Sequence, residues 1–131
     1  MSLTKIGAAL STQLATLKLP TAWENVPFKP TSGQAYLAES LIAGNTIPVG
    51  FANQASDEFG GIYQVLVYSP SDVGKGVGRA TADAVAAAFV RGQRITYGGV
   101  TVTILSTSQS AAFMSGERWV VPVSITYRAF V

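Results

Sequence analysis

The stretch that decides the fold is IYQVLVYSPSDVGKGVGRATADAVAAAFVRG, residues 62–92. From Tyr63 to Tyr68 the chain is largely apolar and rich in β-branched and aromatic residues, which is typical of a covered strand. Pro70 has no N–H for a sheet ladder, and the serine and aspartate residues beside it can cap a helix, so a helix is expected to begin a few residues later. Gly92 then provides a stop for that helix.

The helix in this stretch is predicted to pack through small side chains. Its core-facing stripe, chosen by the three-and-four spacing of an amphipathic helix, consists of Val77, Thr81, Ala84, Val85, Ala88 and Phe89. Arg79 and Asp83 fall on the other side, four residues apart. Because most of the stripe is alanine and valine, the helix can lie close to a sheet, with Phe89 as its one large anchor.

The chain before this stretch is predicted to hold a helix and two extended segments. A leucine-rich stripe with helical spacing predicts a helix over residues 3–18. Residues 23–28 are predicted to form a short or edge strand with Trp23 and Val26 buried, since prolines limit its length. Residues 34–42 are predicted to be a strand with its leucines on one face.

The chain after the central stretch is predicted to be three strands. Residues 93–97 and 100–107 flank a Gly-Gly pair, which is a strong signal for a two-residue hairpin. Residues 106–116 are expected to be a connection, and residues 118–130 alternate as a strand in which Pro122 indicates a bulge or an edge position. The order of elements predicts an α+β fold, a single antiparallel or mixed β-sheet packed against two α-helices.

Residues 44–60, GNTIPVGFANQASDEFG, form the least regular segment of the sequence and are the candidate interaction site. A connection of this length is usually functional or disordered. Two interpretations are open: a projecting hairpin or arm that orders on contact with a partner, and a mobile loop. The candidate interface residues are Asn45, Ile47, Pro48, Val49, Phe51, Asp57 and Glu58.

Composition favours a single compact domain that works by contact. The 131 residues are 48% hydrophobic and only 12% charged, about half the usual charged share. Partner subunits covering part of the surface would account for this, and so would a neutral monomer. The net charge of +2 gives no reason to expect nucleic acid as the main partner. The N-terminus has no secretory or membrane-spanning pattern, so we expect the chain to stay in the cytoplasm where it is made.

Reactive chemistry is poorly represented in the sequence. There is no histidine and no cysteine, which removes the commonest general base, the commonest metal ligand and any thiolate site. The GKGVGR segment at residues 74–79 lacks the spacing of phosphate-binding loops, so its glycines are interpreted as easing a turn and a close helix approach. The seven carboxylates are scattered. We therefore predict no catalytic residue, no metal site and no cofactor.

Taken together, these segments resemble the tail terminator proteins of long-tailed bacteriophages. The features that carry the resemblance are the N-terminal amphipathic helix, the YQVLVYSP strand, the alanine-rich helix ending in FVRG, the GQRITYGGVTVTIL hairpin and the closing RWVVPVSITYRAF strand. The similarity covers nearly the full length of the chain. It rests on the order and type of elements rather than on invariant residues.

The resemblance implies a structural virion protein without enzymatic activity. Such a protein caps the tail tube as a ring, with the tube protein and a head-proximal connector as partners, while DNA passes through without specific binding. The ring is implied to be a hexamer, at the head-proximal end of the tail. Two other hypotheses stay open: another connector or stopper of the phage neck, and an enzyme or small-molecule binder that uses Lys75 or the scattered carboxylates.

Overall fold

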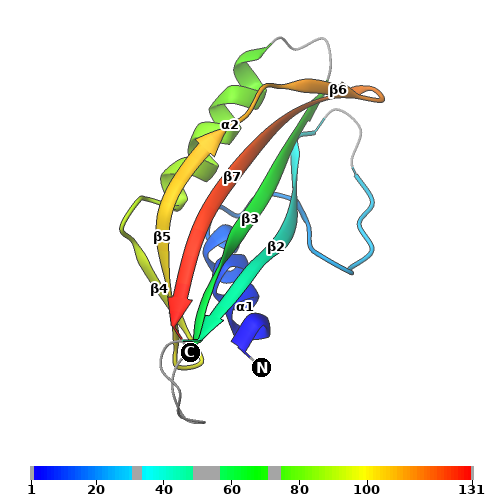
Figure 1. Cartoon of the computed structure of the whole chain (residues 1–131). Coiled ribbons are helices and arrows are strands. Elements are labelled where there is room, and N and C mark those ends of the chain that lie inside the picture. Colours follow the sequence, from blue (N-terminus) through cyan, green and yellow to red (C-terminus); the bar gives the residue numbers. More distant parts are fainter. Residues whose placement is uncertain (1, 31–33, 49–56, 71–74, 131) are drawn as a thin grey trace.

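The computed structural model describes residues 2–30, 34–48, 57–70 and 75–130. Two helices and seven strands make up the described chain (Figure 1). In order they are α1 (Ser2–Ala15), β1 (Thr21–Ala22), β2 (Tyr36–Pro48), β3 (Asp57–Pro70), α2 (Lys75–Ala88), β4 (Arg94–Tyr97), β5 (Val100–Gln109), β6 (Phe113–Ser115) and β7 (Arg118–Phe130).

The strands form one mixed sheet in the order β1-β2-β3-β7-β5-β4. Only β1 and β2 are parallel, and all other pairs are antiparallel. β5 and β6 pair with the same edge of β7: β6 with its first residues, 118–120, and β5 with residues 123–129. Figure 1 shows the three long strands β2, β3 and β7 curving together, with α1 behind them and α2 partly behind β5. The predicted α+β class with a mixed sheet is confirmed.

The core is one cluster of buried apolar side chains drawn from both helices and the sheet. α1 contributes Ile6, Leu10 and Leu14, at the helical spacing read from the sequence. The sheet contributes alternate residues of its central strands, as a half-covered sheet requires. They are Tyr63, Val65, Val67, Val121, Val123, Ile125 and Tyr127. We call the sheet face that carries these residues the inner face and the opposite one the outer face.

The second helix turns only part of the predicted stripe to the core: Val85, Ala88 and Phe89 pack there, whereas Val77 and Ala84 are exposed. Its buried residues are Gly78, Ala82 and Val85, followed by Phe89 just past the helix end, while Val77 is 44% exposed. The ring of Trp119 lies where a side chain at position 78 would go, so only glycine fits there. The larger valine is therefore turned outward, and the helix approaches through its glycine.

The segment after α1 differs from the predicted strand. α1 ends at Ala15 instead of residue 18, and only Thr21–Ala22 pair with β2. Residues 23–26 form a turn in which the Val26 N–H donates to the Trp23 carbonyl oxygen at 3.2 Å. Asn25 has a φ of 56°, which breaks an extended path. Trp23 still packs against the core, but Val26 is exposed and not buried as predicted.

The expected connection over residues 106–116 is mostly strand. β5 runs on to Gln109, and β6 occupies Phe113–Ser115. Pro122 was expected at a bulge or an edge, yet β7 is a central strand. In an antiparallel strand the N–H and C=O of one residue point to the same neighbour. The Pro122 carbonyl accepts from the Ser110 N–H at 2.9 Å, so its missing N–H faces the gap between β5 and β6.

The other sequence expectations hold closely. The predicted hairpin is β4 and β5, and both Gly98 and Gly99 have positive φ, as its two-residue turn requires. The predicted closing strand matches β7. The interpretation of the GKGVGR glycines as a close helix approach is confirmed at Gly78.

Gly78→Ala is expected to destabilise the protein, because an added Cβ would lie 2.9 Å from two carbons of the Trp119 ring and 3.0 Å from Ser69 Oγ. We expect a loss of about 1–3 kcal/mol, the usual cost of overpacking. Gly76→Ala is the matched control, since nothing lies within 4 Å of its added Cβ and alanine favours the helix. Urea unfolding of both variants measures the difference. Equal stability of the two would contradict the close approach of α2.

Candidate functional site

The candidate interface residues that the structure describes lie at one end of the β2–β3 pair. Asn45, Ile47 and Pro48 belong to the end of β2, and Asp57 and Glu58 begin β3. The pairs Ile47↔Glu58 and Pro48↔Asp57 bring four of them together across the ladder. Val49 and Phe51 lie outside the described residues. The two ends of the segment predicted as irregular are thus strand, and we call residues 44–48 and 57–60 the arm base.

Glycines allow an unusually close approach of the two chains at the arm base. A Cβ on Gly44 would lie 2.5 Å from the Gly60 carbonyl oxygen, and one on Gly61 would meet the Ile42 carbonyl oxygen and, at 2.8 Å, the Gly44 nitrogen. The β2–β3 register also shifts between Ala43 and Thr46. Extra residues of this kind bend a strand and change the direction of its next residues. The glycines and the bulge therefore set the direction in which β2 and β3 continue.

A hollow opens on the outer face beside the arm base. It has a volume of about 290 Å³ and is lined by Glu58, Gly60, Gly61, Leu105, Thr126, Tyr127 and Arg128. Gly60 contributes no side chain, and the nearest atom to a Cβ built there is the Tyr127 carbonyl oxygen at 3.8 Å. Leu105 is 37% exposed. The hollow exists largely because β3 carries a glycine at this position.

An ion pair lies at the edge of this hollow. Arg128 Nε is 3.7 Å from Glu58 Oε1, and the two side chains are 45% and 25% exposed. An exposed pair of this kind contributes about 0–1 kcal/mol. Replacing this contact by one with a partner molecule therefore costs little.

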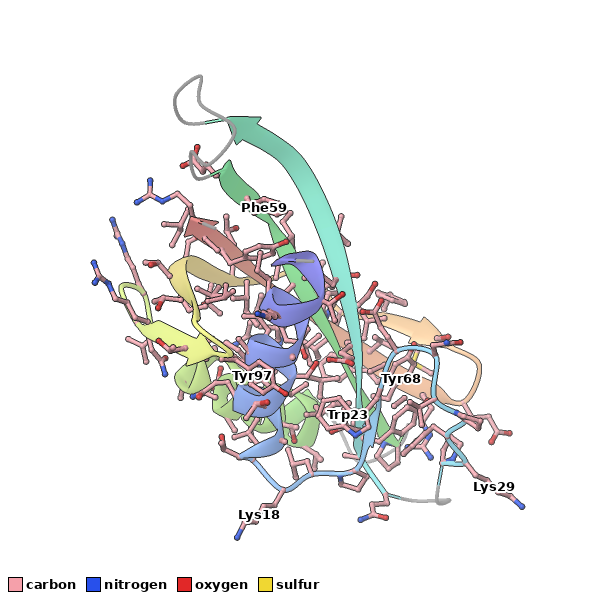
Figure 2. The ribbon with its side chains drawn as sticks, turned by 90° about the horizontal axis from the view of Figure 1, so that it is seen from below. Lys18, Trp23, Lys29, Phe59, Tyr68 and Tyr97 are labelled. Atoms are coloured by element: carbon pink, nitrogen blue, oxygen red, sulfur yellow. The ribbon has the colours of Figure 1, made fainter. Side chains whose placement is uncertain are left out.

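The phenol of Tyr127 is an unusual feature of the core under the arm base. Its oxygen is buried and has no hydrogen-bond partner among the described residues. Burial raises the pKa of Tyr127, because the phenolate would lack solvation. The ring lies directly across the ladder from Gly61, and a Cβ on that glycine would be 2.8 Å from the phenol oxygen. The Tyr127 side chain thus lies over Gly61, next to the arm base. Figure 2 labels Phe59 near the arm end of β3 and Tyr68 near its other end.

A second polar cluster, which the sequence analysis missed, joins α1 to the sheet. Glu39 Oε1 accepts from Ser11 Oγ at 2.6 Å and from the Tyr63 phenol at 2.5 Å, and its Oε2 accepts from the Glu24 N–H at 3.1 Å. Glu24 in turn accepts from the Leu41 N–H at 3.3 Å. Glu39 shares the inward alternation of Leu37 and Leu41, which was the signal available in the sequence. This carboxylate fastens helix, sheet and loop together.

Nothing in the described residues assembles into reactive chemistry. No three acidic side chains of the described chain gather as metal ligands. None of its helices is long and apolar enough to cross a membrane. The carboxylate of Glu39 is engaged by three donors, and the pair at the hollow is a salt bridge.

A model of the family described as phage tail terminator protein matches residues 5–127. The chain belongs to the phage tail terminator family. This confirms the resemblance read from the sequence. Members of this family are structural virion proteins and not enzymes, so the chain is a structural protein of the phage tail or neck.

Solved structures share the fold of this family member over nearly its whole length. One solved chain covers 98% of this chain, and 96% of its own length is covered, with 26% identity and a TM-score of 0.81. Another is a chain of the virion of a native gene transfer agent particle, with 98% and 97% coverage, 16% identity and a TM-score of 0.63. At that identity the second likeness concerns the fold. No curated protein matches the chain.

Gly61→Ala is expected to destabilise this terminator-family chain, because the new Cβ would collide with the β2 backbone and the Tyr127 phenol. We expect a loss of about 1–3 kcal/mol. Gly60→Ala, one residue away on the same strand, is the control and should be neutral or stabilising, since its Cβ has room. Thermal unfolding measures both. If both variants lost the same stability, the close approach at Gly61 would be wrong.

Alkaline pH is expected to unfold the protein in part through Tyr63. Burial first, and then the hydrogen bond to Glu39, raise the pKa of this phenol above its ordinary value of 10.0. The folded state holds the proton more tightly than the unfolded chain, so stability is full below pH 10 and falls as pH rises above it. Tyr63→Phe should lower stability at pH 7 and make the decline above pH 10 shallower. Denaturant unfolding at several pH values tests this, and an unchanged decline would contradict it.

Proposed function

We propose that this chain forms a ring that caps the tail tube, ends its polymerisation and provides the surface for joining the head. The observation that carries the proposal is the match of the tail terminator family over residues 5–127. The partners are other copies of the chain, as a hexamer, together with the tube protein and a head-proximal connector. The ring sits at the head-proximal end of the tail.

The edges of the sheet support such an assembly. A ring needs a head-to-tail contact in which one patch meets a different patch on the next copy. The two edges differ: β4 is the last strand on one side, and β2 has a strand neighbour on its other side only at Leu37 and Ala38 within the described residues. One molecule thus offers two unlike edges, as a heterologous contact requires.

The outer face of the sheet has the chemistry of a surface that becomes covered. Ile42, Ile62 and Leu105 are 46%, 37% and 37% exposed and lie on three different strands. Two outer-face neighbours of Ile62 are polar but uncharged: Thr126, its partner on β7, and Gln64, two residues along β3. A low density of charge with exposed apolar groups matches the core of a protein interface.

The small net charge of +2 is consistent with DNA that passes through the ring without specific binding. Retention of a DNA strand would require a clustered basic patch whose counterions are released on contact. The proposed ring therefore serves as a passage for DNA, and its affinities are directed at proteins.

The direct test is to add the purified chain to polymerising tail tubes and measure tube lengths by negative-stain microscopy. We expect shorter tubes with a cap at one end, and a Phe51→Asp variant that folds normally but fails to cap. Val77→Asp, which changes an equally apolar residue on the exposed side of α2, is the control and should cap normally. Tubes that elongate unchanged with the unaltered chain would contradict the proposal.

A binding assay separates the proposed function from that of a connector or stopper of the neck. A stopper should bind isolated portal complex in preference to tube, whereas the proposed ring should bind tube ends. Titration of labelled chain against both partners distinguishes them.

A further inference from the structure

We propose that the hollow at the arm base receives the side chain of Phe113 from a second copy of this chain. This inference rests on the proposed ring and names a contact through which one copy binds the next. The hollow acts as a socket, and β6, which carries Phe113, acts as the inserting element.

The hollow is suited to an apolar side chain. Gly60 forms the floor of the hollow, because it places no side chain between Glu58 and Ile62 on the outer face. Its partner across the β3–β7 ladder is Arg128. Leu105 and Thr126 line its wall. Its polar edge consists of Glu58 and Arg128, which already contact each other. An apolar group can therefore enter without leaving either charge unpaired.

The hollow is less suited to a metabolite. Small-molecule sites usually have volumes of about 300–1,000 Å³ with several polar groups that converge on the ligand. The hollow, at about 290 Å³, is at the lower end of this range, and its only charged side chains are the paired Glu58 and Arg128. A single aromatic side chain is therefore the better match in polarity.

Phe113 is the side chain that the described structure offers for insertion. It is 47% exposed, and it is the one exposed phenylalanine among the side chains described. β6 is three residues long and exposed throughout, and in Figure 1 it lies at the end of the sheet farthest from the labelled C-terminus. Buried aromatic anchors supply much of the binding energy of protein interfaces.

A molecule cannot fill its own hollow. Phe113 pairs with Val120 near the start of β7, whereas Gly60 pairs with Arg128 near its end. Eight residues of strand separate the two positions, roughly 26 Å at the usual rise. The contact must therefore join two copies, and in the proposed ring it is head-to-tail. A contact of this kind generates a ring when the rotation closes and a filament when it does not.

Filling the socket tests the proposal without damaging the fold. Gly60→Leu should preserve or raise the melting temperature, since a Cβ at position 60 meets no close atom, but should abolish ring formation on tail tubes. Phe113→Ser should have the same effect on assembly. Met114→Ser changes an exposed neighbour of Phe113 whose side chain lies on the other face, and it should assemble normally. Normal rings from Gly60→Leu would overturn the proposal.

Cross-linking identifies the contact itself, because the chain has no native cysteine. In a mixture of Thr126→Cys and Ser115→Cys chains, which keep both Gly60 and Phe113, a short bis-maleimide added in the presence of tubes should yield covalent dimers, since Thr126 lines the hollow and Ser115 lies two residues from Phe113 on β6. Each variant alone should not, since a head-to-tail contact never brings like residues together. As the control, a Thr12→Cys chain, whose cysteine is exposed on α1, is mixed in place of one of the two variants and should give no covalent dimer. Rings that form without a 115–126 cross-link would overturn this contact and leave the proposed function intact, whereas an unaltered chain that never assembles on tubes would overturn both.

Discussion

The antiparallel pairing of β3 with β7 is the constraint on which the rest of the structure depends. Its register runs without interruption from Glu58↔Phe130 to Pro70↔Arg118. Because side chains alternate between faces, this one register turns the valines of both strands toward the helices together. A slip of either strand by one residue would send the inner-face valines of that strand to the outer face. The same register sets the arm base at one end of the sheet and β6 at the other.

The packing beside this pair depends on close approach at glycines. Glycine at position 78 lets α2 reach the Trp119 ring, and glycine at position 61 lets β2 and the Tyr127 ring close over β3. Gly60 instead borders open space and leaves a hollow. Adjacent glycines thus have opposite roles, one in the packing of the monomer and one on a surface.

Much of the fold was readable from the sequence because the signals were local. The valine alternation of residues 118–130 and the Gly98-Gly99 turn have one physical solution each, and both were predicted correctly. On α2, Val85, Ala88 and Phe89 pack in the core as predicted, but Val77 does not. Apolar size pointed to Val77, while the deciding contact is that of Gly78 with Trp119, far along the chain on β7. The position of Pro122 was also predicted wrongly, since it lies in a central strand. A proline fits there because its nitrogen faces the gap between β5 and β6, and that gap forms only when both strands pair with β7.

The candidate site was only partly readable. Composition singled out residues 44–60 as the candidate site. The glycines of this segment do not reveal how β2 and β3 pair. The hollow also depends on Leu105, Thr126 and Arg128, which come from other strands. The Glu39 cluster was likewise hidden, because its donors come from α1 and β3.

The central claim is that this chain acts as a closed set of identical copies on the tail. Averaged electron-microscopy images of isolated tails, viewed along the tube axis at the head-proximal end, test it most directly. We expect a closed ring of copies joined head-to-tail, with sixfold symmetry. A single copy bound at the side of the tube, or an end without this chain, would contradict the account.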